Sequence, residues 1–133
     1  MINCTLMYSI NQDEIMRFIQ AKVRWPLIVN PGRQTGKTTT ACAIAHKCYV
    51  NTGLPALFVA PNRNEWRRLE EQWKPFKEAI KFTTLPNLRN ALAGIRYSVI
   101  IFDEPGLANS YASKVAAEVA FEKDAPVIIF GVA

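Results

Sequence analysis

The chain has 133 residues, enough for one hydrophobic core and too few for two, so we expect a single domain over residues 1–133. Half of the residues are hydrophobic and a fifth are charged, and no apolar run approaches the ~20 residues of a membrane span, so we expect a globular protein with no membrane partner. The net charge of +5 and the pI of about 9.3 favour polyanionic partners such as nucleic acid.

The N-terminal residues lack the basic region, long apolar run and cleavage site of a secretory signal, which favours a cytoplasmic protein. Cys4, Cys42 and Cys48 have neither a metal-binding nor a disulfide spacing, so we interpret them as buried small hydrophobic residues in a reducing compartment. His46 is the single histidine of the chain, and we expect a structural or surface role for it.

Hydrophobic runs separated by Gly and Pro alternate between strand and helix patterns along the chain. The first predicted helix begins after Asn11, a candidate N-cap with Glu14 three residues on and an Ile10/Ile15 hydrophobic staple. The candidate strands, of which the first and fourth are the weaker ones, cover residues 2–8, 27–30, 56–60, 81–85, 98–104 and 126–133. The predicted helices cover residues 12–23, 37–50, 64–76, 86–94 and 110–123.

The predicted strands are apolar without polar alternation, which indicates burial on both faces, and the strand-helix alternation indicates right-handed crossovers. We therefore predict an α/β fold, a three-layer sandwich with a mainly parallel central sheet of about five strands. The helix over 37–50 is small and apolar nearly all round, which predicts a buried helix. In the next helix the stripe Trp66, Leu69, Trp73 and Phe76 favours core packing over a base-stacking platform.

The stretch NPGRQTGKTTTA, residues 30–41, links a predicted strand to a predicted helix. Such a turn presents backbone N–H groups and the positive end of the helix dipole, which suit a di- or triphosphate. In the pattern G-x-x-x-x-G-K-[ST], Gly36 permits close backbone approach, Lys37 reaches the β- and γ-phosphates and Thr38 ligates Mg²⁺. Pro31 replaces the first glycine and fixes φ near about −65°. The residues of this loop expected to bind nucleotide are Pro31, Gly32, Arg33, Gln34, Thr35, Gly36, Lys37, Thr38 and Thr39.

The run SVIIFDE, residues 98–104, brings two carboxylates to the end of an apolar strand. Asp103 is expected, with Thr38, at the metal ion, and Glu104 is the candidate base that polarises an attacking water. The alternative is that the acidic pair only ends the strand and caps a turn before Pro105. Because active sites of parallel sheets lie beyond the carboxyl ends of their strands, the loop and the acidic pair together predict binding and hydrolysis of ATP with Mg²⁺, with GTP left open as the nucleotide.

The core GRQTGKTT, residues 32–39, resembles the Walker A loop of the ATPase domain of phage large terminases, the motors that package viral DNA, a family similar to helicases of the two-RecA-domain type. The segment LFVAPNRNEW, residues 57–66, resembles the strand and P-x-R motif of both groups, and Asp103-Glu104 matches their Walker B pair. The resemblance covers residues 10–131 and implies a RecA-like P-loop NTPase fold and a DNA partner. For a viral chain the location is the host cytoplasm. In terminases the first loop position is often not glycine, which accommodates Pro31.

The resemblance also implies roles for individual residues. Arg33 is expected to touch the γ-phosphate or a neighbouring subunit's nucleotide, which makes Lys37, Arg33 and Glu104 the candidate catalytic residues. Gln12 stands about where the family places an adenine-recognising glutamine, with Gln20 nearby as an alternative. Arg63 is a weaker candidate for contact with DNA or with a neighbouring subunit.

Two hypotheses follow. The first is a terminase-like or helicase-like ATPase acting on DNA, which would complete its site in a homo-oligomeric ring or with other packaging proteins. The second is a nucleotide-binding regulatory or interaction module of viral origin with weak or no hydrolysis, which is favoured because residues 130–133 lack the serine or threonine that the family uses for coupling and because the nuclease and second RecA-like domains are missing. A small-molecule P-loop kinase is disfavoured, since residues 62–68 are too short and helical for its lid.

Overall fold

The computed structural model describes residues 5–7, 11–30, 37–104, 110–123 and 125–131. The strands are β1 (Thr5–Met7), β2 (Leu27–Val29), β3 (Ala56–Ala60), β4 (Ile80–Thr84), β5 (Ile100–Glu104) and β6 (Val127–Gly131). The helices are α1 (Gln12–Gln20), α2 (Lys37–Thr52), α3 (Arg63–Gln72), α4 (Leu88–Leu92) and α5 (Ser110–Lys123), with 3₁₀ turns η1 (Lys74–Phe76) and η2 (Leu85–Asn87). Strands and helices alternate along the chain as the hydrophobic pattern predicts.

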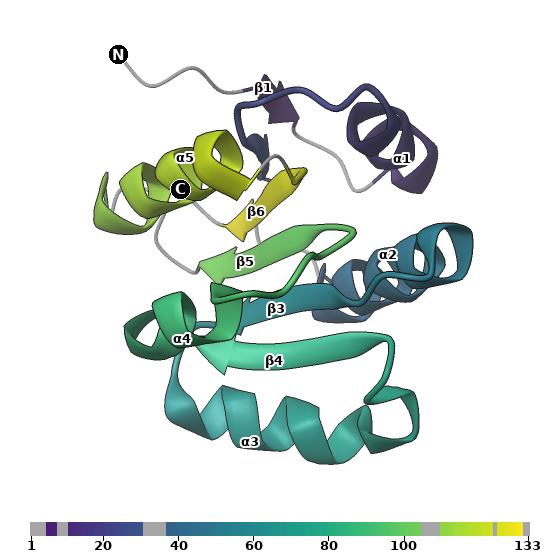
Figure 1. The fold of residues 1–133 in the computed structure, drawn as a ribbon, viewed down its shortest axis with the longest axis vertical. Coiled ribbons are helices and arrows are strands. Elements are labelled where there is room, and N and C mark those ends of the chain that lie inside the picture. The colour runs from purple at the N-terminus through teal and green to yellow at the C-terminus, as the bar shows by residue number, and fades with distance from the viewer. Residues whose placement is uncertain (1–4, 8–10, 31–36, 105–109, 124, 132–133) are drawn as a thin grey trace.

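All strands of the described part belong to one six-stranded sheet in the order β1-β2-β6-β5-β3-β4, and every neighbouring pair is parallel. Figure 1 shows β1 and β4 at the two opposite edges. The sheet has one strand more than the predicted number of about five, because the three-residue β1 pairs with β2 at the edge. The strand β6, from the C-terminal part of the chain, lies between β2 and β5.

Two hydrophobic cores cover the two faces of the sheet. The first joins residues of α1, α2 and α3 to one face, with Phe58 and Phe130 among its fully buried side chains. The second joins α4 and α5 to the other face, around Ile100 and Ile129. Alternate residues of one strand therefore face different helical layers, as Phe58 and Leu57 do in β3. The prediction of an α/β sandwich with a parallel sheet between helices is confirmed.

Local sequence signals account for the helix starts. The side chain of Asn11 accepts a hydrogen bond of 3.1 Å from the backbone N–H of Glu14, so Asn11 is the N-cap of α1 as predicted, while Ile10 lies outside the described residues. The helix ends at Gln20, earlier than predicted, and the chain turns at Lys22 with φ of 54°. Asn62 caps α3 in the same way, at 2.9 Å from the N–H of Glu65.

The predicted burial of α2 is confirmed on one face of the helix and is wrong on the other. Ala41, Ile44 and Ala45 are buried, whereas Lys47 is exposed and Val50 is 66% exposed. The reason is geometric, because the sheet and α1 cover one face of α2 and leave Lys47 and Val50 exposed to solvent.

The aromatic stripe after Asn62 is largely core packing, as predicted. Leu69 is buried, and Trp66 and Trp73 are half-buried against the first core, although Phe76 is 42% exposed. The α-helix ends at Gln72 and a 3₁₀ turn containing a proline follows, so the predicted helix over 64–76 is divided in two.

The cysteine and histidine expectations hold where the structure describes them. Cys42 and Cys48 are buried, and the ring of His46 packs edge-on against Phe76 with centroids 5.2 Å apart. Cys4 lies outside the described residues. Within the described ranges, none of the helices has both the length and the apolarity that crossing a bilayer requires.

Candidate functional site

Because the strands are parallel, their carboxyl ends all lie along one boundary of the sheet, called here the carboxyl edge and distinct from the edge strands β1 and β4. Since the sheet is parallel, the end of β2, which leads toward residues 30–36, and the end of β5, which carries Asp103 and Glu104, lie on this same edge. They are separated by β6, two interstrand spacings of about 4.8 Å each. The residue of β6 that pairs with Glu104 is Gly131, so β6 places no side chain at that row between the two ends.

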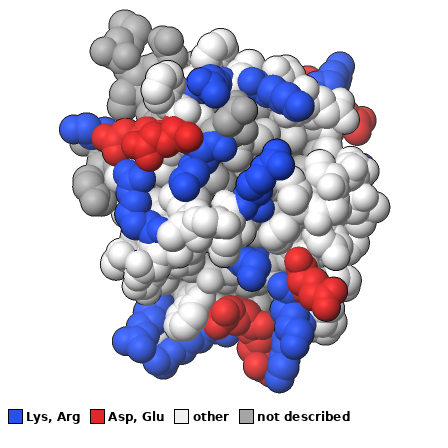
Figure 2. Space-filling model, viewed as in Figure 1, with Lys and Arg blue, Asp and Glu red and all other residues white. Residues whose placement is uncertain are grey.

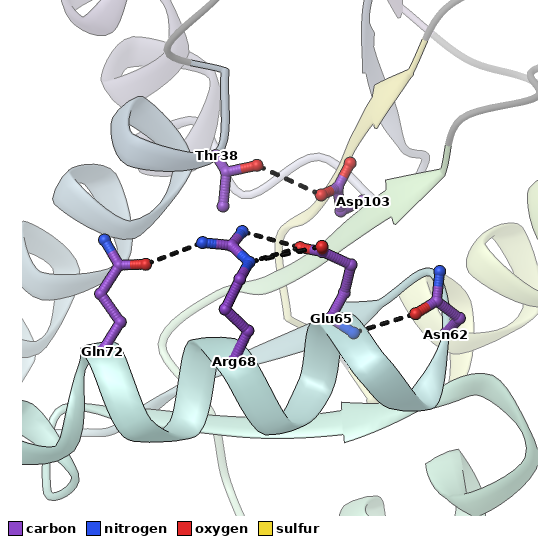
Figure 3. A network of polar contacts seen from close by, with 6 residues as sticks. All are labelled: Thr38, Asn62, Glu65, Arg68, Gln72 and Asp103. Carbon is purple, nitrogen blue, oxygen red and sulfur yellow. Dashed lines mark hydrogen bonds and ion pairs between the residues drawn. The ribbon is translucent and has the colours of Figure 1, made fainter.

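One hydrogen bond joins the two predicted motifs. The hydroxyl of Thr38, the second residue of α2, donates to Oδ2 of Asp103 at 3.3 Å, across 65 positions of sequence. Both side chains are partly buried, and Figure 3 shows them pointing toward one another. The start of α2 and the end of β5 are therefore adjacent, as the sequence predicts.

The start of α2 is electrostatically suited to an anion. A helix of this length, Lys37–Thr52, leaves its first N–H groups without helical partners and carries partial positive charge at that end. Its first turn contains no acidic residue to offset that charge. Asp103 is the carboxylate that the described residues place beside this helix end.

Cys42 lies a little over one turn into α2, and the charges of Asp103 and Arg68 affect the pKa of its thiol. Burial, together with the smaller effect of the negative charge of Asp103, raises the pKa of the Cys42 thiol to about 12, and the charge of Arg68 partly opposes this rise. Cys42 therefore stays protonated and acts as a small apolar contact beside the charged groups. Burial alone raises the pKa of Cys48 to about 11.

Arg68 of α3 is a residue that the sequence analysis missed. Its Nη2 lies 2.7 Å from Oε2 of Glu65, and its Nη1 donates to Oε1 of Gln72 at 3.0 Å. The hydrogen bonds and charge of Glu65 raise the pKa of Arg68, and the charge of Asp103 adds to this effect. In Figure 3 the guanidinium reaches from α3 toward Thr38 and Asp103.

The spacing of Glu65, Arg68 and Gln72 at i, i+3 and i+7 predicts a ladder of polar side chains on one face of α3. The spacing does not tell which part of the folded chain these side chains face. Leu69, the next residue of α3, packs into the first core, and this contact fixes the rotation of the helix and with it the direction of Arg68. The simpler interpretation is that Arg68 forms only an exposed ion pair with Glu65, since 53% of the Arg68 side chain is exposed and such pairs contribute little to stability. Asp103 is a second carboxylate whose charge raises the pKa of Arg68, with a smaller effect than Glu65.

Much of the predicted phosphate loop lies outside the described residues, namely Pro31, Gly32, Arg33, Gln34, Thr35 and Gly36. Lys37 begins α2 and Glu104 ends β5, as the motifs require, but their side chains also lie outside the described part. Thr39 is exposed on the first turn of α2. The location of the candidate site therefore follows from the start of α2, the end of β5 and the contact between Thr38 and Asp103.

The more distant candidates are not brought into contact with this pair. Gln12 is the exposed first residue of α1, and Gln20 is exposed at the other end of that helix. No described hydrogen bond joins either glutamine to Thr38 or Asp103. Arg63, the first residue of α3, is exposed five residues before Arg68.

Comparison of the chain with known protein families, with curated proteins and with solved structures finds no match.

Proposed function

We propose that this chain binds ATP with Mg²⁺ and hydrolyses it, as a terminase-like or helicase-like ATPase with a RecA-like P-loop fold that acts on DNA during viral DNA packaging. The observation that carries the proposal is the hydrogen bond from Thr38 to Asp103. It joins the hydroxyl of the G-K-T motif to the acid of the second motif at the carboxyl edge of a parallel sheet, where such folds bind their ligands.

The residues at this edge fit a magnesium ion. A hydroxyl and a carboxylate are hard oxygen ligands, and Mg²⁺ is commonly held by one or two protein oxygens together with substrate phosphates and water. Thr38 and Asp103 would hold the ion, which supplies charge neutralisation at the β- and γ-phosphates.

The protein groups then divide the work of phosphoryl transfer. The N–H groups at the start of α2 and the ammonium of Lys37 bind the phosphates. Glu104 accepts a proton from the attacking water, and its place at the end of β5, beside Asp103, suits that role. Arg33 stabilises charge on the transferred phosphoryl group, and Arg68 is a further cation directed at the same edge.

A binding measurement tests whether the chain binds ATP, which hydrolysis requires. A fluorescent ATP analogue is titrated into the wild type, into Lys37→Ala and into Lys47→Ala, with and without Mg²⁺. Lys47 is exposed further along the same helix, so its variant controls for the loss of one charge from α2. We expect Lys37→Ala alone to abolish binding. Equal affinity in all three proteins would show that ATP binds at another site. No binding by any of them would refute the proposal.

The alternative function is a nucleotide-binding regulatory or interaction module, in which the same strand ends hold a nucleotide with weak or no hydrolysis. An ATPase assay with and without DNA, repeated across protein concentrations, separates the two. A motor that completes its site by assembly responds to both variables, because a neighbouring subunit supplies charge in trans. A module that only binds nucleotide responds to neither.

A further inference from the structure

A groove of about 600 Å³ lies over the edge strand β4, beside α3 and η1. It is lined by residues of α3 and β4 and of the turn between them, and it is separate from the Thr38–Asp103 pair. Adjacent helical residues point about 100° apart, so α3 directs Arg67 to this groove and Arg68 toward the strand ends.

The groove carries an excess of positive charge. Four exposed cations line it, against two carboxylates, Glu70 and Glu71, so two positive charges are in excess. The cations are Arg67, Lys74, Lys77 and Lys81. The ion pairs between described residues instead join Arg68 to Glu65 and Arg89 to α5. Within the described part of the chain, no carboxylate therefore lies within ion-pair distance of the groove cations. Figure 2 shows basic and acidic side chains side by side over the α3 end of the molecule.

The lining also contains aromatic surface. Trp73, which belongs to the stripe predicted to pack in the core, and Phe82 are both half-buried. Their inner sides pack against the first core, and the remainder of each side chain lines the groove. The core contact fixes these rings in place, so stacking on their free surface costs little side-chain entropy. Cations beside fixed aromatic rings are the combination that holds single strands, because phosphates meet the charges and unstacked bases meet the rings.

We propose that this groove binds single-stranded nucleic acid. The inference rests on the DNA-directed part of the proposed function and names the surface involved, but it requires no nucleotide at the strand ends. A duplex would offer phosphates to the lysines and no free base to Trp73 or Phe82, which is why the single strand is the better fit.

The test is fluorescence anisotropy with a labelled oligothymidylate of about 16 nucleotides, at salt concentrations from about 50 to about 200 mM. The groove variant is Lys74→Gln/Lys81→Gln, and the matched control is Lys47→Gln/Lys114→Gln, which removes the same charge from exposed sites on α2 and α5. We expect the groove variant to bind about tenfold more weakly and to reduce the salt slope by about 1.4, since each phosphate contact to a single strand contributes about 0.7. The control should bind like the wild type.

Several outcomes would overturn the proposal: equal losses in both variants, no binding by the wild type, or tighter binding of a duplex or of polyglutamate than of the single strand. Lys37→Ala keeps the two proposals distinguishable. Loss of nucleotide binding with retained oligothymidylate binding supports both, whereas a chain that binds the single strand and no ATP refutes the ATPase and leaves the groove intact.

Discussion

The hydroxyl of Thr38 donates a 3.3 Å hydrogen bond to the carboxylate of Asp103, which joins the first turn of α2 to the end of β5. Under the proposed function, these two residues would hold the magnesium ion of the bound nucleotide.

Replacing Thr38 by alanine removes a ligand for Mg²⁺ and leaves the Asp103 carboxylate without this donor. Because Mg²⁺ would lose one of its few protein ligands, we expect the affinity for ATP with Mg²⁺ to fall about tenfold or more. The affinity for ATP without Mg²⁺ should change much less. Thr38→Ser keeps the hydroxyl and should behave like the wild type. A similar loss in Thr38→Ser, or no loss in Thr38→Ala, would argue against the metal role.

Replacing Arg68 by alanine should lower the rate of ATP hydrolysis about 10- to 100-fold, if the guanidinium stabilises charge at the terminal phosphate. The preference for ATP over ADP should fall with it, because only ATP presents that phosphate. Arg67→Ala is the control, since Arg67 is exposed on the neighbouring position of α3 and lines the groove over β4.

A purely structural Arg68 gives a different result. An exposed ion pair such as that with Glu65 contributes about 0.2–1 kcal/mol, so the free energy of unfolding would fall slightly while nucleotide preference stayed unchanged. Arg68 lowers the pKa of Glu65, so the stability from this pair is present at neutral pH and is lost as the pH falls through the lowered pKa of that carboxyl. Urea unfolding of wild type and Glu65→Gln at neutral and acidic pH measures it.

Glu104→Gln should retain ATP binding and lose hydrolysis, because the amide keeps the size of the side chain and cannot accept the proton of the attacking water. Binding and turnover are measured on the same preparation. Glu14→Gln, at an exposed position of α1, serves as the control for loss of one carboxylate. Turnover equal to that of the wild type would remove Glu104 from the role of base.

The buried thiols make the fold sensitive to alkali. Burial raises the pKa of Cys42 to about 12 and that of Cys48 to about 11, from an ordinary value of 9.0. The folded protein thus holds these protons more tightly than the unfolded chain, so the stabilisation is complete below pH 9.0 and is lost as the pH rises through 11 to 12. In a Cys4→Ser background, a thiol reagent at mildly alkaline pH should react slowly until denaturant is added. Fast reaction of the folded chain would show that the thiols are accessible.

Phe58→Ala should lower the free energy of unfolding by about 3–5 kcal/mol, because the ring is fully buried between the sheet and its helices and its loss leaves a cavity. Val50→Ala, at a position 66% exposed on α2, should change it by no more than about 0.5 kcal/mol. Denaturant unfolding followed by circular dichroism compares the two. Equal effects would mean that the core is not packed around Phe58.

The sequence by itself determined the order and type of the elements. Runs such as ALFVA are apolar at every position, and only a strand buried on both faces by helices satisfies that pattern, so β3 has the predicted bounds Ala56–Ala60. The caps Asn11 and Asn62 could be foreseen because their hydrogen bonds join residues three positions apart. The Lys37-Thr38 part of the G-K-T motif could likewise be assigned to a helix start and Asp103-Glu104 to a strand end, since local pattern decides where helices begin and strands stop.

Tertiary structure alone decided how these pieces meet. The position of β6 between β2 and β5, the contact of Thr38 with Asp103 and the direction of Arg68 all depend on pairings between residues far apart in sequence. A helical period shows which side chains share a face of α2 or α3. Whether that face is buried or exposed depends on which neighbouring element packs against it. This is why α2 has an exposed side that its composition did not predict, and why an arginine on α3 points toward Thr38 and Asp103, which lie on other elements.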